Sequence, residues 1–176
     1  MESWEEFKAK NPHLKDFLPY LETLNKESPR GRVLISTGFI EEQLREILLA
    51  FMLAGKEAER LLEGGNAPLG TLSARTDACY SLGLISQDEH HDLVLIRRIR
   101  NEFAHQVHTS FETPSVVSRC KELRHSAKSY TKPDGEEIVV NAAGQFQTAA
   151  VALISNLVNR AHYVAKQRRS YGDWPR

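Results

Sequence analysis

The chain has 176 residues, of which 41% are hydrophobic and 26% are charged, and its 23 basic residues balance its 23 acidic residues. These are ordinary globular proportions, and the length fits one domain whose core needs no metal or disulfide for support. A formal net charge of zero excludes whole-molecule attraction to nucleic acid or to an anionic membrane, so any such binding must use a local patch.

The sequence shows no pattern typical of a signal peptide or a membrane-spanning helix. The N-terminal sequence has no basic segment followed by an apolar run, and no stretch stays apolar for the ~18 residues that a membrane span requires. We therefore expect a cytoplasmic protein without a membrane partner.

The only two cysteines, Cys79 and Cys120, are far apart and have no Cys or His companions at metal-site spacing. This pattern predicts buried free thiols, and we expect no metal and no cofactor.

The first elements are short. Ser3 followed by Glu6 matches a capping box and predicts a short helix, and a second short segment, 14–24, contains Pro19 and is expected to bend. These short N-terminal helices occupy residues 1–27.

A strong helix is expected beyond Ser28-Pro29-Arg30-Gly31. Its apolar residues recur at intervals of three and four, and they are Val33, Leu34, Ile40, Leu44, Ile47, Leu48 and Phe51. This spacing predicts a central bundle helix, closed by Gly55. Another short helix is expected over 56–63, before the loop 64–68.

Two tightly connected helices follow. Thr71 is expected to cap a helix that runs to Leu82 and ends at Gly83, and Ser86 with Glu89 forms a second capping box. The short turn predicts an antiparallel or angled pair that buries Leu72, Leu82, Leu84 and Ile85. In the second helix, Leu93, Ile96, Ile99 and Phe103 are expected to form one core-facing stripe.

The remainder also reads as mostly helical. Thr113-Pro114 opens a helix that continues to Leu123, and a turn at 132–135 makes residues 131–143 either a short hairpin or a mobile loop. A long helix is expected from Gln145 to about Arg168, before a frayed tail at 170–176. We find no internal repeat and no linker. The sequence therefore predicts a single all-α helical bundle, with one domain over 1–176.

The most informative functional segment is Ile-Arg-Arg-Ile-Arg-Asn-Glu-Phe-Ala-His, residues 96–105. Arg100 carries a permanent planar charge suited to a phosphate, and His105 exchanges a proton near neutral pH, so the pair has the parts for phosphodiester chemistry. Asn101 lies four residues before His105 and can touch it, but Arg100 is about 140° away around the helix. A symmetric homodimer would bring Arg100 of one chain to His105 of the other.

We therefore predict a catalytic set of Arg100, Asn101 and His105. The residues expected to bind RNA or a protein partner are Arg97, Arg98 and His108. A structural alternative pairs Arg100 with Asp92 or with Glu102 of a neighbouring chain, while His105 stabilises the helix end. A further alternative keeps the motif for dimer packing only.

Other charged groups have simpler interpretations. His90 and His91 are consecutive and point in different directions on a helix, which disfavours a metal site. The basic residues near the end of the chain are interpreted as solvated helix faces and a basic tail; they are Arg160, Lys166, Arg168, Arg169 and Arg176.

The middle of the chain resembles a known family. The series Pro68-Leu69-Gly70, Leu72-Ser73-Ala74-Arg75 and Tyr80-Ser81-Leu82-Gly83 is similar to the mannitol operon repressor (MltR) family, with a looser likeness over about 30–125. That resemblance implies a transcriptional regulator without a helix-turn-helix, acting through a regulatory protein partner. We find no groove-reading motif, so direct sequence-specific DNA binding is not expected.

The segment from Ile99 to His105, followed by Ser110-Phe111, also resembles the arginine-histidine signature of the HEPN superfamily. That resemblance implies a helical bundle, often dimeric, and for many members a metal-independent RNA endonuclease of toxin or defence systems. It implies catalytic roles for Arg100 and His105, with Asn101 as polar neighbour, and an antitoxin as partner. Regulation through protein contacts is the leading expectation, and the endoribonuclease is the alternative.

Overall fold

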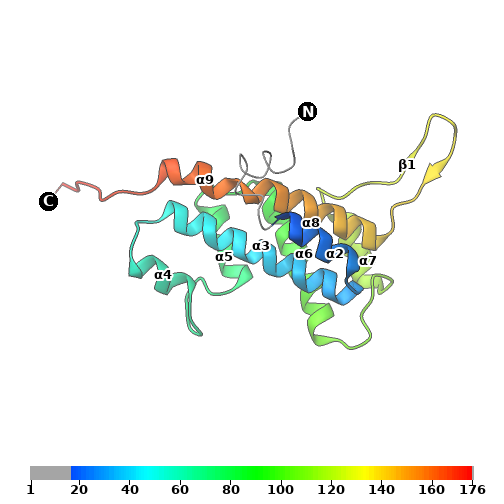
Figure 1. Cartoon of the computed structure of the whole chain (residues 1–176), viewed down its shortest axis with the longest axis horizontal. Helices are drawn as coiled ribbons and strands as arrows, with labels where there is room; N and C mark the ends of the chain where they lie inside the picture. Colours follow the sequence, from blue (N-terminus) through cyan, green and yellow to red (C-terminus); the bar gives the residue numbers. More distant parts are fainter. Residues whose placement is uncertain (1–16, 176) are drawn as a thin grey trace.

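The computed structural model describes residues 17–175 and forms an all-α bundle with one tiny two-stranded sheet (Figure 1). The capping box expected at Ser3 lies outside the described residues. The elements are α2 (Phe17–Lys26), α3 (Pro29–Phe51), α4 (Lys56–Leu62), α5 (Leu72–Ser81), α6 (Gln87–His105), α7 (Pro114–Glu122), β1 (Tyr130–Thr131), β2 (Glu137–Ile138), α8 (Ala142–Val158), α9 (Arg160–Val164) and the 3-10 turn η2 (Ala165–Gln167).

Helix α3 is the centre of the bundle, in contact with α5, α6, α8 and α9. Ser28 caps it by accepting a hydrogen bond from the Gly31 N–H, and Pro29 occupies the first helical position. The predicted apolar stripe is largely confirmed, because Val33, Ile40, Leu44, Ile47 and Leu48 are fully buried. Two members of the predicted stripe differ: Phe51 is only partly buried, and Leu34 is 38% exposed.

Pro19 lies within α2, and the bend expected in segment 14–24 stays a prediction, because residues 14–16 lie outside the described part of the chain. The expected closure of α3 was wrong. Gly55 does not close α3, which ends at Phe51; Gly55 is the N-cap of α4. The carbonyl of Phe51 accepts the Arg169 N–H at 2.8 Å. A distant segment thus satisfies a terminal carbonyl of α3, which local spacing does not reveal.

The connection between α5 and α6 follows its capping signals. Thr71 accepts the Ala74 N–H, Gly83 takes a left-handed φ of 70°, and Ser86 and Glu89 form a complete capping box. The predicted stripe of Leu93, Ile96, Ile99 and Phe103 is fully buried. Leu82 was predicted to be buried but is 45% exposed, because it lies beyond the last helical turn of α5.

The long helix expected from Gln145 to Arg168 is divided. Asn141 caps α8, and Asn159 is both the C-cap of α8 and the N-cap of α9. The segment 131–143 contains the second strand of a short hairpin, in which Tyr130 pairs with Ile138. Figure 1 shows the hairpin at one end of the molecule and the segment after α9 at the other.

Both cysteines are buried free thiols, as predicted. Burial raises the pKa of Cys79 and that of Cys120 to about 12. Over residues 17–175, no helix is long and apolar enough to cross a membrane.

Candidate functional site

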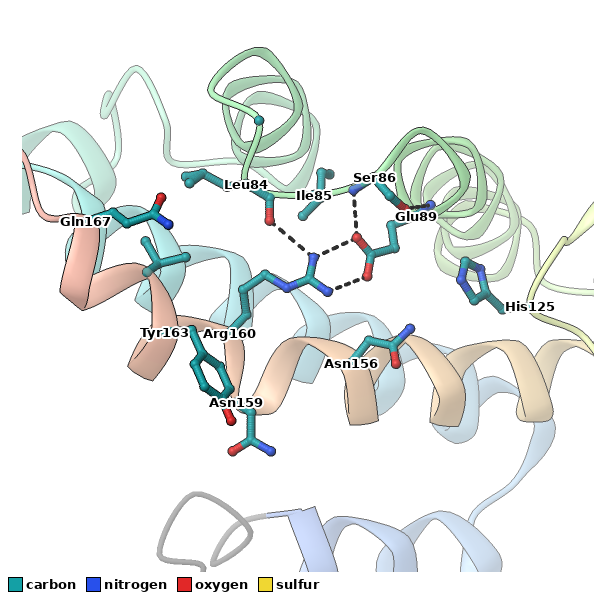
Figure 2. Close-up of a pocket in the computed structure, with 12 residues that line it drawn as sticks. Leu84, Ile85, Ser86, Glu89, His125, Asn156, Asn159, Arg160, Tyr163 and Gln167 are labelled. Atoms are coloured by element: carbon teal, nitrogen blue, oxygen red, sulfur yellow. Dashed lines mark hydrogen bonds and ion pairs between the residues drawn. The ribbon is translucent and has the colours of Figure 1, made fainter.

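A hollow lined by convergent polar groups lies between the α5–α6 turn and the junction of α8 with α9, and has a volume of about 780 Å³ (Figure 2). We call it the junction hollow. Its polar lining is contributed by Ser86, Glu89, His125, Asn156, Asn159, Arg160, Tyr163 and Gln167. The three side-chain amides offer both donors and acceptors, so the hollow can form hydrogen bonds of either polarity.

An ion pair between the half-buried Arg160 and the buried Glu89 forms one wall of this hollow. Arg160 donates to both carboxylate oxygens of Glu89 at 2.7 and 2.8 Å and to the Leu84 carbonyl at 3.2 Å (Figure 2). The Glu89 side chain is 4% exposed and also accepts the Ser86 N–H at 2.7 Å. Burial alone would raise the pKa of Glu89, but the hydrogen bonds from Arg160 and Ser86 lower it below its ordinary value. The pair therefore ties α9 to the start of α6.

A second buried carboxylate lies behind His125. Asp92 is fully buried and accepts the backbone N–H groups of Arg124 and His125 at 2.8 and 2.9 Å. It also contacts Nδ1 of His125 at 2.9 Å and Nδ1 of His91 at 3.1 Å. Burial would raise the pKa of Asp92, but these hydrogen bonds lower it. The carboxylate fixes the segment after α7 onto α6.

The predicted arginines line a different hollow, of about 450 Å³, which we call the arginine hollow. It is lined by Glu41, by residues 70–73 and by Arg97, Arg100 and Asn101. Arg100 donates to Oδ1 of Asn101 at 3.2 Å. Neither Arg97 nor Arg100 forms an ion pair with a carboxylate in the described part of the chain. The hollow thus holds guanidinium groups that are open to an external anion.

The remaining predicted residues lie outside the arginine hollow. His105 is the last residue of α6, and His105, Arg98 and His108 are exposed. The structure therefore brings Arg97, Arg100 and Asn101 together but does not place His105 among them. Endoribonuclease chemistry at Arg100 and His105 remains a prediction that requires a second chain to supply the missing group.

The proposed pairing of Arg100 with Asp92 was wrong. Eight residues along a helix span about 12 Å, and Asp92 faces the core, where its oxygens accept from residues 124 and 125. Glu102 is also occupied within its own chain, because it accepts from Ser115 at 2.7 Å and forms an ion pair with Arg119.

Sequence reasoning missed the partners that build the junction hollow. Glu89 was identified only as a helix cap, and Arg160 was grouped with solvated basic residues. The two are 71 positions apart, so no local signal connects them. Asp92 and His125 are likewise joined only by the fold. The described residues contain no group of three or more His, Cys, Asp or Glu side chains arranged to hold a metal.

The Leu-Ser-Ala-Arg motif has a structural role here. Arg75 is 8% exposed and donates to the carbonyls of Leu69, Glu41 and Leu62 at 2.9, 3.1 and 2.9 Å. A Cβ on Gly70 would lie 3.0 Å from the Ala67 carbonyl, so the preceding loop is too tight for a side chain there. The motif therefore secures the loop before α5 against α3.

The depressed carboxyl pKa values of Glu89 and Asp92 predict acid sensitivity. Glu89 and Asp92 have folded-state pKa values below their ordinary values, so they contribute stability that is present above about pH 4 and is lost as the pH falls through the folded pKa values. Urea midpoints should be similar at pH 7 and 6 and should fall between pH 5 and 3. A midpoint that is unchanged at pH 3 would contradict this expectation.

Comparison with known proteins gives one informative match. No family model and no curated protein matches the sequence. Among solved structures, a chain of the X-ray structure of the MtlR-HPr complex from Escherichia coli aligns with a TM-score of 0.54 and 23% identity. The alignment covers 85% of this chain and 95% of that chain. The protein therefore shares its fold with a chain of that complex.

Proposed function

We propose that this chain is an MtlR-like regulatory protein that acts by binding another protein rather than by reading DNA. The observation that carries the proposal is the shared fold with a chain solved in complex with HPr. The resemblance of residues 68–83 to the mannitol operon repressor family supports the same function. Fold alone does not define function, so the proposal needs a surface and a partner to test.

The binding surface in this proposal is the C-terminal half of α6 and the residues just after it. We call it the α6 basic surface, made of Arg97, Arg98, Arg100, His105 and His108. Elsewhere in the bundle, arginines such as Arg45, Arg119 and Arg160 already pair with carboxylates. The three arginines of α6 have no such partner among the described residues, and carboxylates of a binding partner can supply one. Arginine is also enriched at the residues that dominate binding energy.

HPr is the partner to test first, because it accompanies the chain that shares this fold. Isothermal titration of this protein with HPr should show saturable binding. Replacing Arg97, Arg98 and Arg100 together by Gln should weaken it at least tenfold, since each lost charge-assisted contact removes about 1 kcal/mol or more. Arg60→Gln is the matched control, because Arg60 is exposed on α4 and pairs with Glu57.

The titration tests the choice of partner and the choice of binding surface separately. No heat with the folded wild type would reject HPr as the partner. Equal affinity of the wild type and the triple variant would instead reject the α6 basic surface. A homodimer and an antitoxin partner belong to the endoribonuclease alternative, and both remain predictions.

A further inference from the structure

The segment from α9 onward collects exposed aromatic and cationic side chains. Tyr163, Tyr171 and Trp174 are 62%, 89% and 79% exposed. Lys166 lies over the Tyr163 ring, with its Nζ 5.1 Å from the centroid. A cluster of highly exposed large aromatics is unusual on a folded surface and more often marks a contact site. We call this set the aromatic tail; it comprises Tyr163, Lys166, Arg168, Arg169, Tyr171 and Trp174.

The charge of this region differs from that of the whole chain. Residues 160–176 contain five basic residues and one acidic residue, Asp173, which gives a net charge of +4 in a chain whose total is zero. Arg160 is committed to Glu89. Lys166, Arg168 and Arg169 form no ion pair with a described carboxylate. A local positive patch therefore exists despite overall neutrality.

Hydrogen bonds to the end of α3 hold Arg168 and Arg169 in place, and the residues after them are exposed to solvent. The Arg169 N–H donates to the Phe51 carbonyl at 2.8 Å, and Nη1 of Arg168 donates to the Met52 carbonyl at 3.2 Å. Residues 168–175 form no helix or strand and are exposed. Figure 1 shows this segment leading away from the bundle. Its side chains are thus available to a ligand rather than used in packing.

We propose that the aromatic tail binds single-stranded nucleic acid, with unpaired bases stacked on Tyr163, Tyr171 and Trp174 and phosphates near Lys166, Arg168 and Arg169. Alternating ring faces and cations are the arrangement that such ligands require. A duplex hides its base faces, so the rings would have nothing to stack on. Residues 168–175 form no helix and contain no Leu, Ile, Val or Met, so the tail lacks the amphipathic helix with which interfacial segments bind a membrane surface.

The test uses the full chain and a 20-nucleotide oligouridylate with a terminal dye. Fluorescence anisotropy should show saturable binding at low salt. A plot of log affinity against log salt should have a slope of about −2, because three cations each contribute about 0.7 for a single strand. In a Trp4→Phe background, Trp174 emission should be quenched on binding, since a stacked base lies against the ring.

Two double variants separate the contribution of base stacking to the affinity from that of the phosphate contacts. Tyr171→Ser combined with Trp174→Ser should weaken binding at least tenfold with little change in salt slope. Lys166→Gln combined with Arg169→Gln should reduce the slope to about −0.7. The Arg60→Gln variant is the control and should bind like the wild type.

Three results would overturn the proposal. The first is wild-type affinity in the tail variants together with a loss in the Arg97, Arg98 and Arg100 triple variant, which would move the site to α6. The second is tighter binding of a duplex of equal length than of the single strand. The third is quenching of Trp174 by anionic vesicles of phosphatidylserine and phosphatidylcholine but not by the oligonucleotide. Each outcome is independent of HPr titration, so this proposal and the proposed regulatory function fail separately.

Discussion

Replacing Asp92 by Ala is expected to lower the free energy of unfolding by about 3 kcal/mol, because several donors lose one buried acceptor. The backbone N–H groups of Arg124 and His125 and the rings of His91 and His125 all converge on this carboxylate. Water can rescue some of these donors at the partly exposed histidines, whereas the site of the carboxylate itself is sealed. Urea denaturation at pH 7 measures the loss.

Asp88→Ala is the matched control for this substitution. Asp88 lies one helical turn earlier, is 59% exposed and pairs with the Arg124 side chain, so its loss should cost less than about 1 kcal/mol. If Asp92→Ala were no more destabilising than Asp88→Ala, the buried carboxylate would not be the anchor of the segment after α7.

Replacing Arg160 by Met is expected to destabilise the protein by about 2–4 kcal/mol at pH 7, because it leaves the Glu89 carboxylate buried without its cation. Arg160 itself is 27% exposed, so water entering the junction hollow should keep the loss toward the lower end of this range. The unpaired Glu89 should then have a raised pKa. A raised folded-state pKa favours stability at low pH, so the deficit should shrink as the pH falls from 7 toward 4.

The double variant Glu89→Gln with Arg160→Met, compared with the two single variants, measures the interaction energy between the two charges. Gln can still accept the Ser86 N–H in the capping box, so the double variant keeps the helix cap while removing both charges. It should be more stable than the sum of the single changes predicts, by at least about 1.5 kcal/mol. Strict additivity, measured by urea denaturation, would show that the two charges do not depend on each other.

Elements with local signals were predicted well from the sequence. Thr71 and Ser86 are N-caps where the capping residues were expected, because the cap is decided within three residues. The stripe from Leu93 to Phe103 is buried because spacing on a helix fixes which face it occupies. The end of α3 was mispredicted at Gly55, since its last carbonyls are satisfied by residues 168 and 169.

The same distinction between local and long-range signals applies to the two hollows. Arg97, Arg100 and Asn101 were found from one helix and do lie together in the arginine hollow. The junction hollow needed Glu89 and Arg160 from opposite parts of the chain, and no periodicity connects them. The basic composition around Arg160 led to the prediction that this residue is solvated. Its ion pair with the buried Glu89 could not be predicted from composition.

The sealed thiols of Cys79 and Cys120 have a practical consequence for labelling. With pKa values near 12 and no exposed surface, neither supplies a thiolate that a maleimide dye can reach at neutral pH. Ser170→Cys would therefore give one reactive handle without removal of the native cysteines. A fluorophore there would report motions of the segment beyond α9 through its anisotropy, with the interior of the bundle chemically untouched.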